Sequence, residues 1–367
     1  MSARRPLEGL KVVEVGLALA GPYAGSLLAE LGAQVIKIER PGGGDPLRLM
    51  GASVGDVTVW WGIAARAKLC IDLDLKNPDD RDVFLKLIRD ADAMVENYRP
   101  GVLDRMGLGW TELRKINPRL VMLSISGFGQ TGPQSGRPGF GKIAEAMSGI
   151  VVLTGEPDQV PMHIGFSLAD TATGLMGAFG VALGLYQRDV GGADGTRVDL
   201  ALFEPLFRMA ECQLALAERT GKAPAREGSN DPYGWGVSGP PGTAPGSNHN
   251  ALKAVRCSDG HWLMLPAVTE QALLRQAESL SINEALRLLR EQGVESARVH
   301  DGASLAAEAY FTDRGDVRTA SDPVVGRMSL VGEVPKTYRD PVLPLFRATK
   351  PDADRLKIQE LAGLNPQ

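Results

Sequence analysis

The sequence predicts an α/β protein, in which a doubly wound domain with a parallel sheet precedes a smaller α+β domain. In the first two hundred residues, short runs rich in β-branched residues alternate with longer helical patterns. Such alternation is typical of a parallel sheet that helices cover on both faces. A stretch dense in Gly, Pro, Ser and Asn at 221–250 then separates this region from the rest of the chain. That composition is typical of a loop or linker.

The elements of the first region follow one another in order. Apolar runs of strand length, which predict buried strands, lie at 11–15, 34–39, 93–98, 120–126 and 196–202. Helical patterns lie between or after them, at 22–31, 79–89 and 202–219. Because most of these strands show no polar alternation, we expect them to be covered on both faces.

The second region has a different pattern. The segment 251–266 predicts a hairpin whose turn is Ser258-Asp259-Gly260, and helical patterns follow at 270–280 and 283–292. We therefore expect a small α+β domain that is entered through the Gly/Pro-rich linker.

Charge and composition exclude several classes of protein. Forty basic and 44 acidic residues give a formal net charge of −4, so neither a nucleic-acid partner nor a polybasic membrane surface is expected. The three cysteines, Cys70, Cys212 and Cys257, are far apart, and the four histidines form no HxH or HExxH group. A disulfide framework and a metal site are therefore not predicted.

No segment predicts secretion or a membrane anchor. The first residues lack an apolar secretory core, and the longest uncharged run, 171–187, is rich in glycine. It is shorter than the ~20 apolar residues that a spanning helix needs. We expect a soluble cytoplasmic protein.

The turn after the first strand is rich in glycine, as in dinucleotide-binding domains. Gly16, Gly21 and Gly25 do not have the GxGxxG spacing, although Glu39 stands where such domains place an acid. The favoured interpretation is a tight turn with close helix–sheet packing, and nicotinamide chemistry is a weaker alternative.

Cations are scattered near the expected carboxyl ends of the strands. They are Lys37, Arg40, Lys76, Arg99 and Arg105. In an open α/β sheet these strand ends face the crevice where ligands bind, and arginines there suit a phosphorylated ligand. Taken singly, each of these side chains more often only solvates the surface.

Asp170 directly precedes a helical pattern, which by itself predicts a helix N-cap. The helix that follows carries Gly174, Gly177, Gly180 and Gly184 close to one face. Each interior glycine costs a helix about 1 kcal/mol relative to alanine. We therefore expect a close neighbour along this stripe: another backbone, a partner subunit or a ligand.

Four segments together resemble one enzyme family. They are GLALAGPYAGSLLAELGAQVIKIERPGGGDPLR, LDLKNPDDRDVFLKLIRDADAMVENYRPGVLDRMGLGW, SISGFGQTGP and ADTATGLMGAFGVALGLYQRD. In this order they resemble the class III CoA-transferases, also called the CaiB/BaiF or formyl-CoA-transferase-like family. The resemblance implies a Rossmann-like large domain over 1–222 plus 318–367, a small domain over 223–317, and an interlocked homodimer. The dimer would then supply the close neighbour of the glycine stripe.

The resemblance also implies a reaction and a site. Asp170 matches the family's nucleophile, and the CoA-contacting positions match Arg40, Leu73, Lys76, Asn97, Tyr98 and Arg105. The implied reaction moves CoA from an acyl-CoA to a carboxylic acid through an aspartyl anhydride and an aspartyl-CoA thioester. Coenzyme A is then a substrate, and no tightly bound cofactor is expected. A position at a helix N-terminus should keep Asp170 ionised, and the loop 238–248 should offer backbone N–H groups to an oxyanion.

Two departures keep alternatives open. Related acyl-CoA racemases have a histidine where this chain has Phe140, which argues against racemase or isomerase chemistry. Ala65 and the Pro-bearing loop 238–248 also depart from the family pattern. They motivate a third hypothesis, a non-catalytic acyl-CoA-binding relative.

Overall fold

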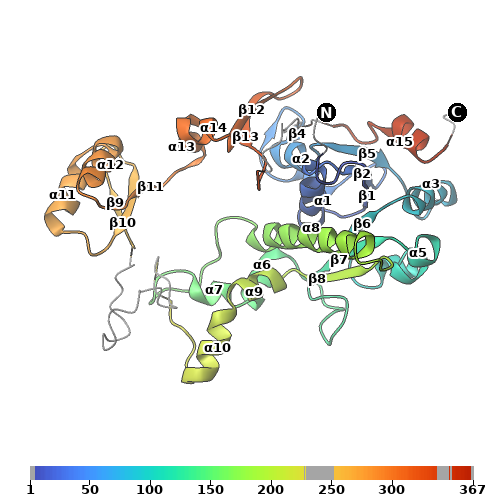
Figure 1. Ribbon diagram of the computed structural model, residues 1–367, viewed down its shortest axis with the longest axis horizontal. Helices are drawn as coiled ribbons and strands as arrows, with labels where there is room; N and C mark the ends of the chain where they lie inside the picture. The colour runs from blue at the N-terminus through green and yellow to red at the C-terminus, as the bar shows by residue number, and fades with distance from the viewer. Residues whose placement is uncertain (1–4, 227, 229–251, 337–346, 348, 365–367) are drawn as a thin grey trace. The chain divides into compact units, whose positions relative to one another are not determined.

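The computed structural model describes residues 5–226, 228, 252–336, 347 and 349–364 (Figure 1). The chain forms two compact units. The first unit comprises Met1–Ser148, Gly165–Met209 and Arg314–Gln367, and the second comprises Gly149–Ile164 and Ala210–Asp313. Residues 238–248 and His249 lie outside the described residues.

A six-stranded parallel sheet forms the centre of the first unit. Its order is β5-β2-β1-β6-β7-β8. The strands are β1 (Lys11–Glu14), β2 (Gln34–Glu39), β5 (Lys68–Asp72), β6 (Ala93–Glu96), β7 (Val121–Ser126) and β8 (Arg197–Ala201). The predicted α/β architecture with a parallel sheet is therefore confirmed. The sequence did not predict β5, because its five residues begin and end with a charge.

The strand order reverses between β1 and β6. From β1 the chain builds outward through β2 to β5, and then returns to the other side of β1 to add β6, β7 and β8. The loops after β1 and β6 therefore leave the sheet in opposite directions, which opens a crevice at the carboxyl ends of these two strands.

Helices cover both faces of the sheet, because alternate side chains of each strand point to opposite faces. On one face α8 (Leu168–Asp189) packs on β7 and β8 and beside α1 (Ala20–Glu30). On the other face the core joins residues of three helices to Ile36, Ile71 and Met122. These helices are α3 (Pro78–Arg89), α5 (Trp110–Ile116) and α15 (Arg355–Leu361).

The glycine stripe of α8 contacts this chain's own sheet and helix α1. A Cβ at Gly177 would lie 2.7 Å from Leu123 Cδ2, and one at Gly184 would lie 2.7 Å from Val121 Cγ1. At Gly174 a Cβ would lie 2.7 Å from the Tyr23 ring. The expectation that a partner subunit supplies the close neighbour is therefore wrong for the described residues, since the glycines let α8 lie directly on β7.

Helix α8 is longer than the uncharged run suggested. Its 22 residues are long and apolar enough, by length and composition alone, to cross a membrane. Half of its most apolar window is nevertheless buried inside the protein. Core helices of soluble proteins have the same property, and the contacts with β7, β8 and α1 are those of a core helix.

The second unit has its own core. A three-stranded sheet of order β11-β10-β9 packs against α11 (Gln271–Ser279) and α12 (Ile282–Glu291). The strands are β9 (Leu252–Arg256), β10 (Trp262–Pro266) and β11 (Ala297–Arg298). The predicted hairpin and both predicted helices are confirmed, with ends that differ by one or two residues.

The remaining elements are short, apart from one helix of ten residues. They are η1 (Pro46–Leu49), β3 (Ser53–Val54), β4 (Val57–Thr58), α2 (Val59–Ala64), α4 (Val102–Arg105), α6 (Gly141–Met147), α7 (Ile150–Leu153), α9 (Glu204–Met209), α10 (Glu211–Thr220), α13 (Gly302–Ala307), α14 (Ala309–Asp313), β12 (Val317–Asp322) and β13 (Gly326–Val331).

Candidate active site

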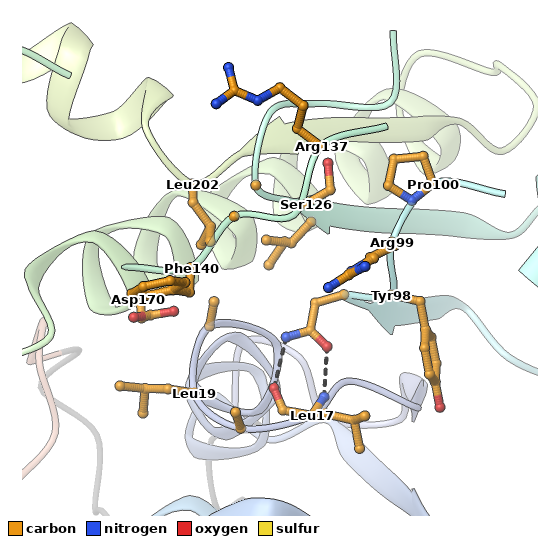
Figure 2. A pocket seen from close by; sticks show the side chains of 16 residues that line it. Leu17, Leu19, Tyr98, Arg99, Pro100, Ser126, Arg137, Phe140, Asp170 and Leu202 are labelled. Carbon is orange, nitrogen blue, oxygen red and sulfur yellow. Dashed lines mark hydrogen bonds between the residues drawn. The ribbon is translucent and has the colours of Figure 1, made fainter. Parts of the chain in front are cut away.

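A pocket of about 180 Å³ lies in the first unit, at the crevice between β1 and β6 (Figure 2). The loop after β1 forms one wall with residues 17–20, and the loop after β6 forms another with residues 97–100. The end of β7, the segment 137–140 and the start of α8 complete it. Leu202, which directly follows β8, also lines it, so the fold brings six separate segments of the chain to one cavity.

Asp170 lines this pocket from the first turn of α8. The residue that begins the helix is Ser167, so Asp170 stands at the third helical position and the predicted N-cap role is wrong. Its carboxylate lies against the backbone of Gly141. A Cβ at Gly141 would come 3.2 Å from Asp170 Cγ and well inside van der Waals contact with Oδ2. The absence of a side chain at Gly141 therefore makes room for the carboxylate.

Burial is the main influence on the charge of Asp170. Burial and, to a smaller extent, the neighbouring carboxylate of Glu145 raise the pKa of Asp170 to about 6, although its own backbone N–H and Lys142 oppose the shift. Glu145 is 1% exposed and pairs with Lys142 at 2.9 Å. The expectation that the helix N-terminus keeps the carboxylate ionised therefore holds only above about pH 6.

Asn97 holds the loop that follows β1. Its Oδ1 accepts a hydrogen bond from Leu17 N at 2.7 Å, and its Nδ2 donates to Leu17 O at 2.7 Å (Figure 2). The next residue, Ala18, has a φ of 59°, in the left-handed region, and its N–H donates to Asp45 Oδ1 at 2.9 Å. Two side chains from outside the loop therefore fix the backbone of this pocket wall.

A buried ionic network lies behind this loop. The Lys37 ammonium is 3.1 Å from Glu14 and 2.7 Å from Asp45, and all three side chains are at most 1% exposed. Lys68 contacts the other oxygen of Glu14 at 2.7 Å. Burial opposes the charged form of Lys37, but Glu14 and Asp45 outweigh it and raise the pKa of Lys37. The network keeps Asp45 in place to hold Ala18.

The glycines of the first turn serve close packing. A Cβ at Gly21 would lie 3.2 Å from Gly16 Cα, and one at Gly25 would overlap the Glu14 carboxylate. The interpretation as a tight turn with close helix–sheet packing is therefore confirmed.

The structure brings part of the predicted residue set together. Asn97 and Tyr98 line the same pocket as Asp170, whereas Arg40, Leu73, Lys76 and Arg105 are not among the residues that line it. Leu73 is 2% exposed, and the three cations are exposed. Arg40 follows β2, Leu73 and Lys76 follow β5, and Arg105 ends α4, which follows β6. All four therefore belong to the edge of the sheet at which the pocket lies.

Ser126, Arg137 and Phe140 are among the other residues that line the pocket with Asp170. Ser126 ends β7, so the rule that applied to Asn97 would have found it. Arg137 and Phe140 belong to the loop before α6, whose sequence carries no periodic signal. The sequence indicates Phe140 only as the residue that stands where related racemases have a histidine. Among the described residues no group of three or more His, Cys, Asp or Glu side chains has metal-binding geometry.

Comparison with known proteins gives a consistent result. The model of CoA-transferase family III matches residues 7–282. A succinyl-CoA–D-citramalate CoA-transferase of Chloroflexus aurantiacus is 32% identical over 92% of this chain and 89% of its own. An acetyl-CoA:oxalate CoA-transferase of Acetobacter aceti is 44% identical over 62% of this chain and 59% of its own. The solved structure of a CAIB/BAIF family protein from Brucella suis has a TM-score of 0.84 at 28% identity, and covers 98% of this chain and 100% of that one.

Proposed function

Because this chain belongs to CoA-transferase family III, we propose that Asp170 is the nucleophile with which it moves CoA from an acyl-CoA to a carboxylic acid. That the enzyme transfers CoA follows from the family and from its named relatives. The position of Asp170 supports this role. Its carboxylate lies in the pocket at the point of the sheet where the strand order reverses.

The chemistry follows from that carboxylate. An Asp170 oxygen attacks the thioester carbonyl, a C–O bond forms, the C–S bond breaks, and CoA leaves as a thiolate. The thiolate then attacks the aspartyl carbonyl, which releases the donor acid and leaves an aspartyl-CoA thioester. The acceptor carboxylate displaces CoA to form a new anhydride, and the thiolate attacks the acceptor's carbonyl to regenerate Asp170. No proton is gained or lost, so the cycle needs a carboxylate and no acid–base pair.

The environment of Asp170 suits this role. Burial that raises its pKa to about 6 makes the carboxylate more basic than an exposed one, while it stays mainly ionised at neutral pH. A partly buried site also protects the anhydride from water. Phe140 lines the pocket where racemase chemistry would need an imidazole, so no observation in this pocket favours that alternative.

Coenzyme A binds, in this proposal, along the same edge of the sheet as a substrate, with no tightly bound cofactor. The contacting residues are Arg40, Leu73, Lys76, Asn97, Tyr98 and Arg105. Support comes from the three cations, which are exposed and form no ion pair within the described residues. Their charges are therefore available for the phosphates of CoA.

The active form is an interlocked homodimer in the cytoplasm. Support comes from the solvent side of α8, where four apolar residues are exposed: Leu175, Phe179, Leu183 and Tyr186. Val190, which directly follows the helix, is exposed too. The spacing of the four helical residues, three or four positions apart, puts them on one face of the helix. An exposed apolar stripe of this kind is typical of an interface.

Trapping the intermediate tests the proposal. The enzyme is incubated with an acyl-CoA, hydroxylamine is added, and the peptide that contains Asp170 is analysed by mass spectrometry. We expect a hydroxamate on Asp170 in the wild type and in Asp158→Asn, an exposed acid outside the pocket, and none in Asp170→Asn. Full acyl exchange by Asp170→Asn would exclude the proposed role. Binding of CoA without any exchange in the wild type would favour the non-catalytic hypothesis.

A further inference from the structure

Glu96 is a buried carboxylate that the transfer of CoA does not use. It is the last residue of β6, is 3% exposed, and is not among the residues that line the pocket. Its Oε2 accepts a hydrogen bond from Tyr98 N at 2.9 Å, and its side chain is also hydrogen-bonded to Ser124. Ser124 lies opposite Glu96 in the pairing of β6 with β7 and is buried. One carboxylate therefore ties the start of the loop after β6 to the neighbouring strand.

The chain of hydrogen bonds continues beyond Ser124. Arg197 Nε, from β8, donates to Ser124 Oγ at 3.1 Å, and Arg197 Nη2 donates to Gln130 Oε1 at 2.8 Å. Gln130 belongs to the loop after β7, and its backbone N–H donates to Asp199 Oδ1 at 3.0 Å. One polar network thus joins the loops after β6 and β7, and residues of both loops line the pocket.

The directions of these hydrogen bonds require an acceptor at Glu96. Because Ser124 Oγ accepts from Arg197, the Ser124 hydroxyl has its hydrogen to donate to Glu96. Tyr98 N donates to Glu96 as well. An ionised carboxylate only accepts, whereas a protonated one must itself donate. Protonation of Glu96 would therefore set a donor against a donor or turn the Ser124 hydroxyl away, and the ionised form fits this arrangement.

The charges around Glu96 allow it to change its protonation near neutral pH. Burial and, to a smaller extent, the charge of Asp104 on α4 raise the pKa of Glu96 to about 7. The hydrogen bonds from Ser124 and Tyr98 and the charge of Arg197 oppose this shift. Removal of any of these three contacts should therefore raise the pKa of Glu96 further.

Resting on the proposed contacts of Asn97 and Tyr98 with CoA, we propose that Glu96 is a positioning residue, whose ionised carboxylate holds the loop 97–100 in the form that binds CoA. Figure 2 shows Tyr98, Arg99 and Pro100 in succession on the wall that this loop forms. When the bond to Tyr98 N is lost, the binding form is only part of the population, and the affinity for CoA falls by that fraction. Asp170 belongs to another element, α8, so the rate of the chemical step should change little.

Calorimetric titration with CoA from pH 6 to pH 8 tests the inference on the wild type, Glu96→Gln and Ser124→Ala. Glu112→Gln, an exposed glutamate of α5, is the control. The Kd of the wild type and of the control should rise as the pH falls through about 7, because Glu96 becomes protonated. The phosphate monoester of CoA titrates near pH 6, but it does so equally for every variant.

The two variants should change this profile in different ways. Glu96→Gln keeps the size of the side chain but places an NH₂ donor where an oxygen accepts. Its Kd at pH 8 should be about tenfold higher than that of the wild type, with no change centred near pH 7, while kcat at saturating acyl-CoA stays within about twofold. Ser124→Ala removes a bond that favours the ionised form, so the midpoint of the rise should move to a higher pH.

The outcomes separate positioning from a general structural role. A folded Glu96→Gln protein with the Kd and pH profile of the wild type would overturn the inference. A kcat that falls as much as the affinity would overturn it too, because a general disturbance of the site lowers both. If Glu96→Gln does not fold, an unmoved midpoint in Ser124→Ala overturns it instead. Tyr98→Ala should raise the Kd at every pH, and a wild-type Kd in that variant would overturn the proposed contacts with CoA as well as this inference.

Discussion

Alanine at Gly141 should displace the nucleophile and leave the protein folded. The added Cβ would come 3.2 Å from Asp170 Cγ and too close to Oδ2. An ordinary C···O contact is ~3.4 Å, so the carboxylate must move by about 1 Å. The atoms that must move are the end of one side chain, and Gly141 has no positive φ, so the fold should tolerate the change. A misplacement of about 1 Å in a reacting group costs about 100-fold in rate.

The measurement is steady-state CoA transfer by Gly141→Ala, together with the Tm and the Kd for CoA. We expect kcat to fall about 100-fold, with Tm and Kd close to those of the wild type. Gly302→Ala is the matched control, because Gly302 also occupies the first position of a short helix and has no atom within 4 Å of its added Cβ. A folded Gly141→Ala protein with the kcat of the wild type would refute the reasoning.

Three further outcomes test the charges around the site. Glu145→Gln removes a charge that raises the pKa of Asp170. The pH at which kcat/KM falls to half on the acidic side, near pH 6 in the wild type, should therefore decrease in this variant. A midpoint equal to that of the wild type would contradict this. Asp170→Asn should increase the free energy of unfolding at pH 7.5 by up to about 3 kcal/mol. The folded pKa of about 6 lies above the ordinary 3.8, so the wild type loses stability as pH rises between these values, and denaturant titration at pH 4 should show no gain. Lys37→Met leaves Asp45 buried without a cation and Glu14 with Lys68 alone, and should cost about 3–5 kcal/mol in urea titrations. A loss below about 1 kcal/mol would contradict the role of the network.

The sequence predicts those elements of the fold whose residue pattern lies within one short segment of the chain. The strands at 11–15 and 34–39 are apolar runs that stay buried on both faces, and the hairpin around Asp259 has a turn signature. Strand β5 was missed because it is short and carries Lys68 and Asp72 at its ends. Lys68 belongs in the core only because Glu14 neutralises it, and that pairing joins residues 54 positions apart.

The site was predictable to the extent that it follows strand ends. Asn97 and Tyr98 are the last residues of the strand predicted at 93–98, and they line the pocket with Asp170. The space that Gly141 leaves for the Asp170 carboxylate could not be predicted, because it depends on contact between the first turns of α6 and α8. The raised pKa of Asp170 depends on burial among such segments, which no sequence pattern reports.

In the loop after β1, the main chain is fixed by residues outside the loop, whereas the loop's own side chains face the pocket. Its backbone is held at Leu17 by Asn97 and at Ala18 by Asp45, and neither contact involves a side chain of the loop. The side chains of Leu17 and Leu19 line the pocket. Substitutions at these two positions can therefore change which acid fits while the same main-chain path is kept, so selection or a designed library can act on specificity without first rebuilding the fold.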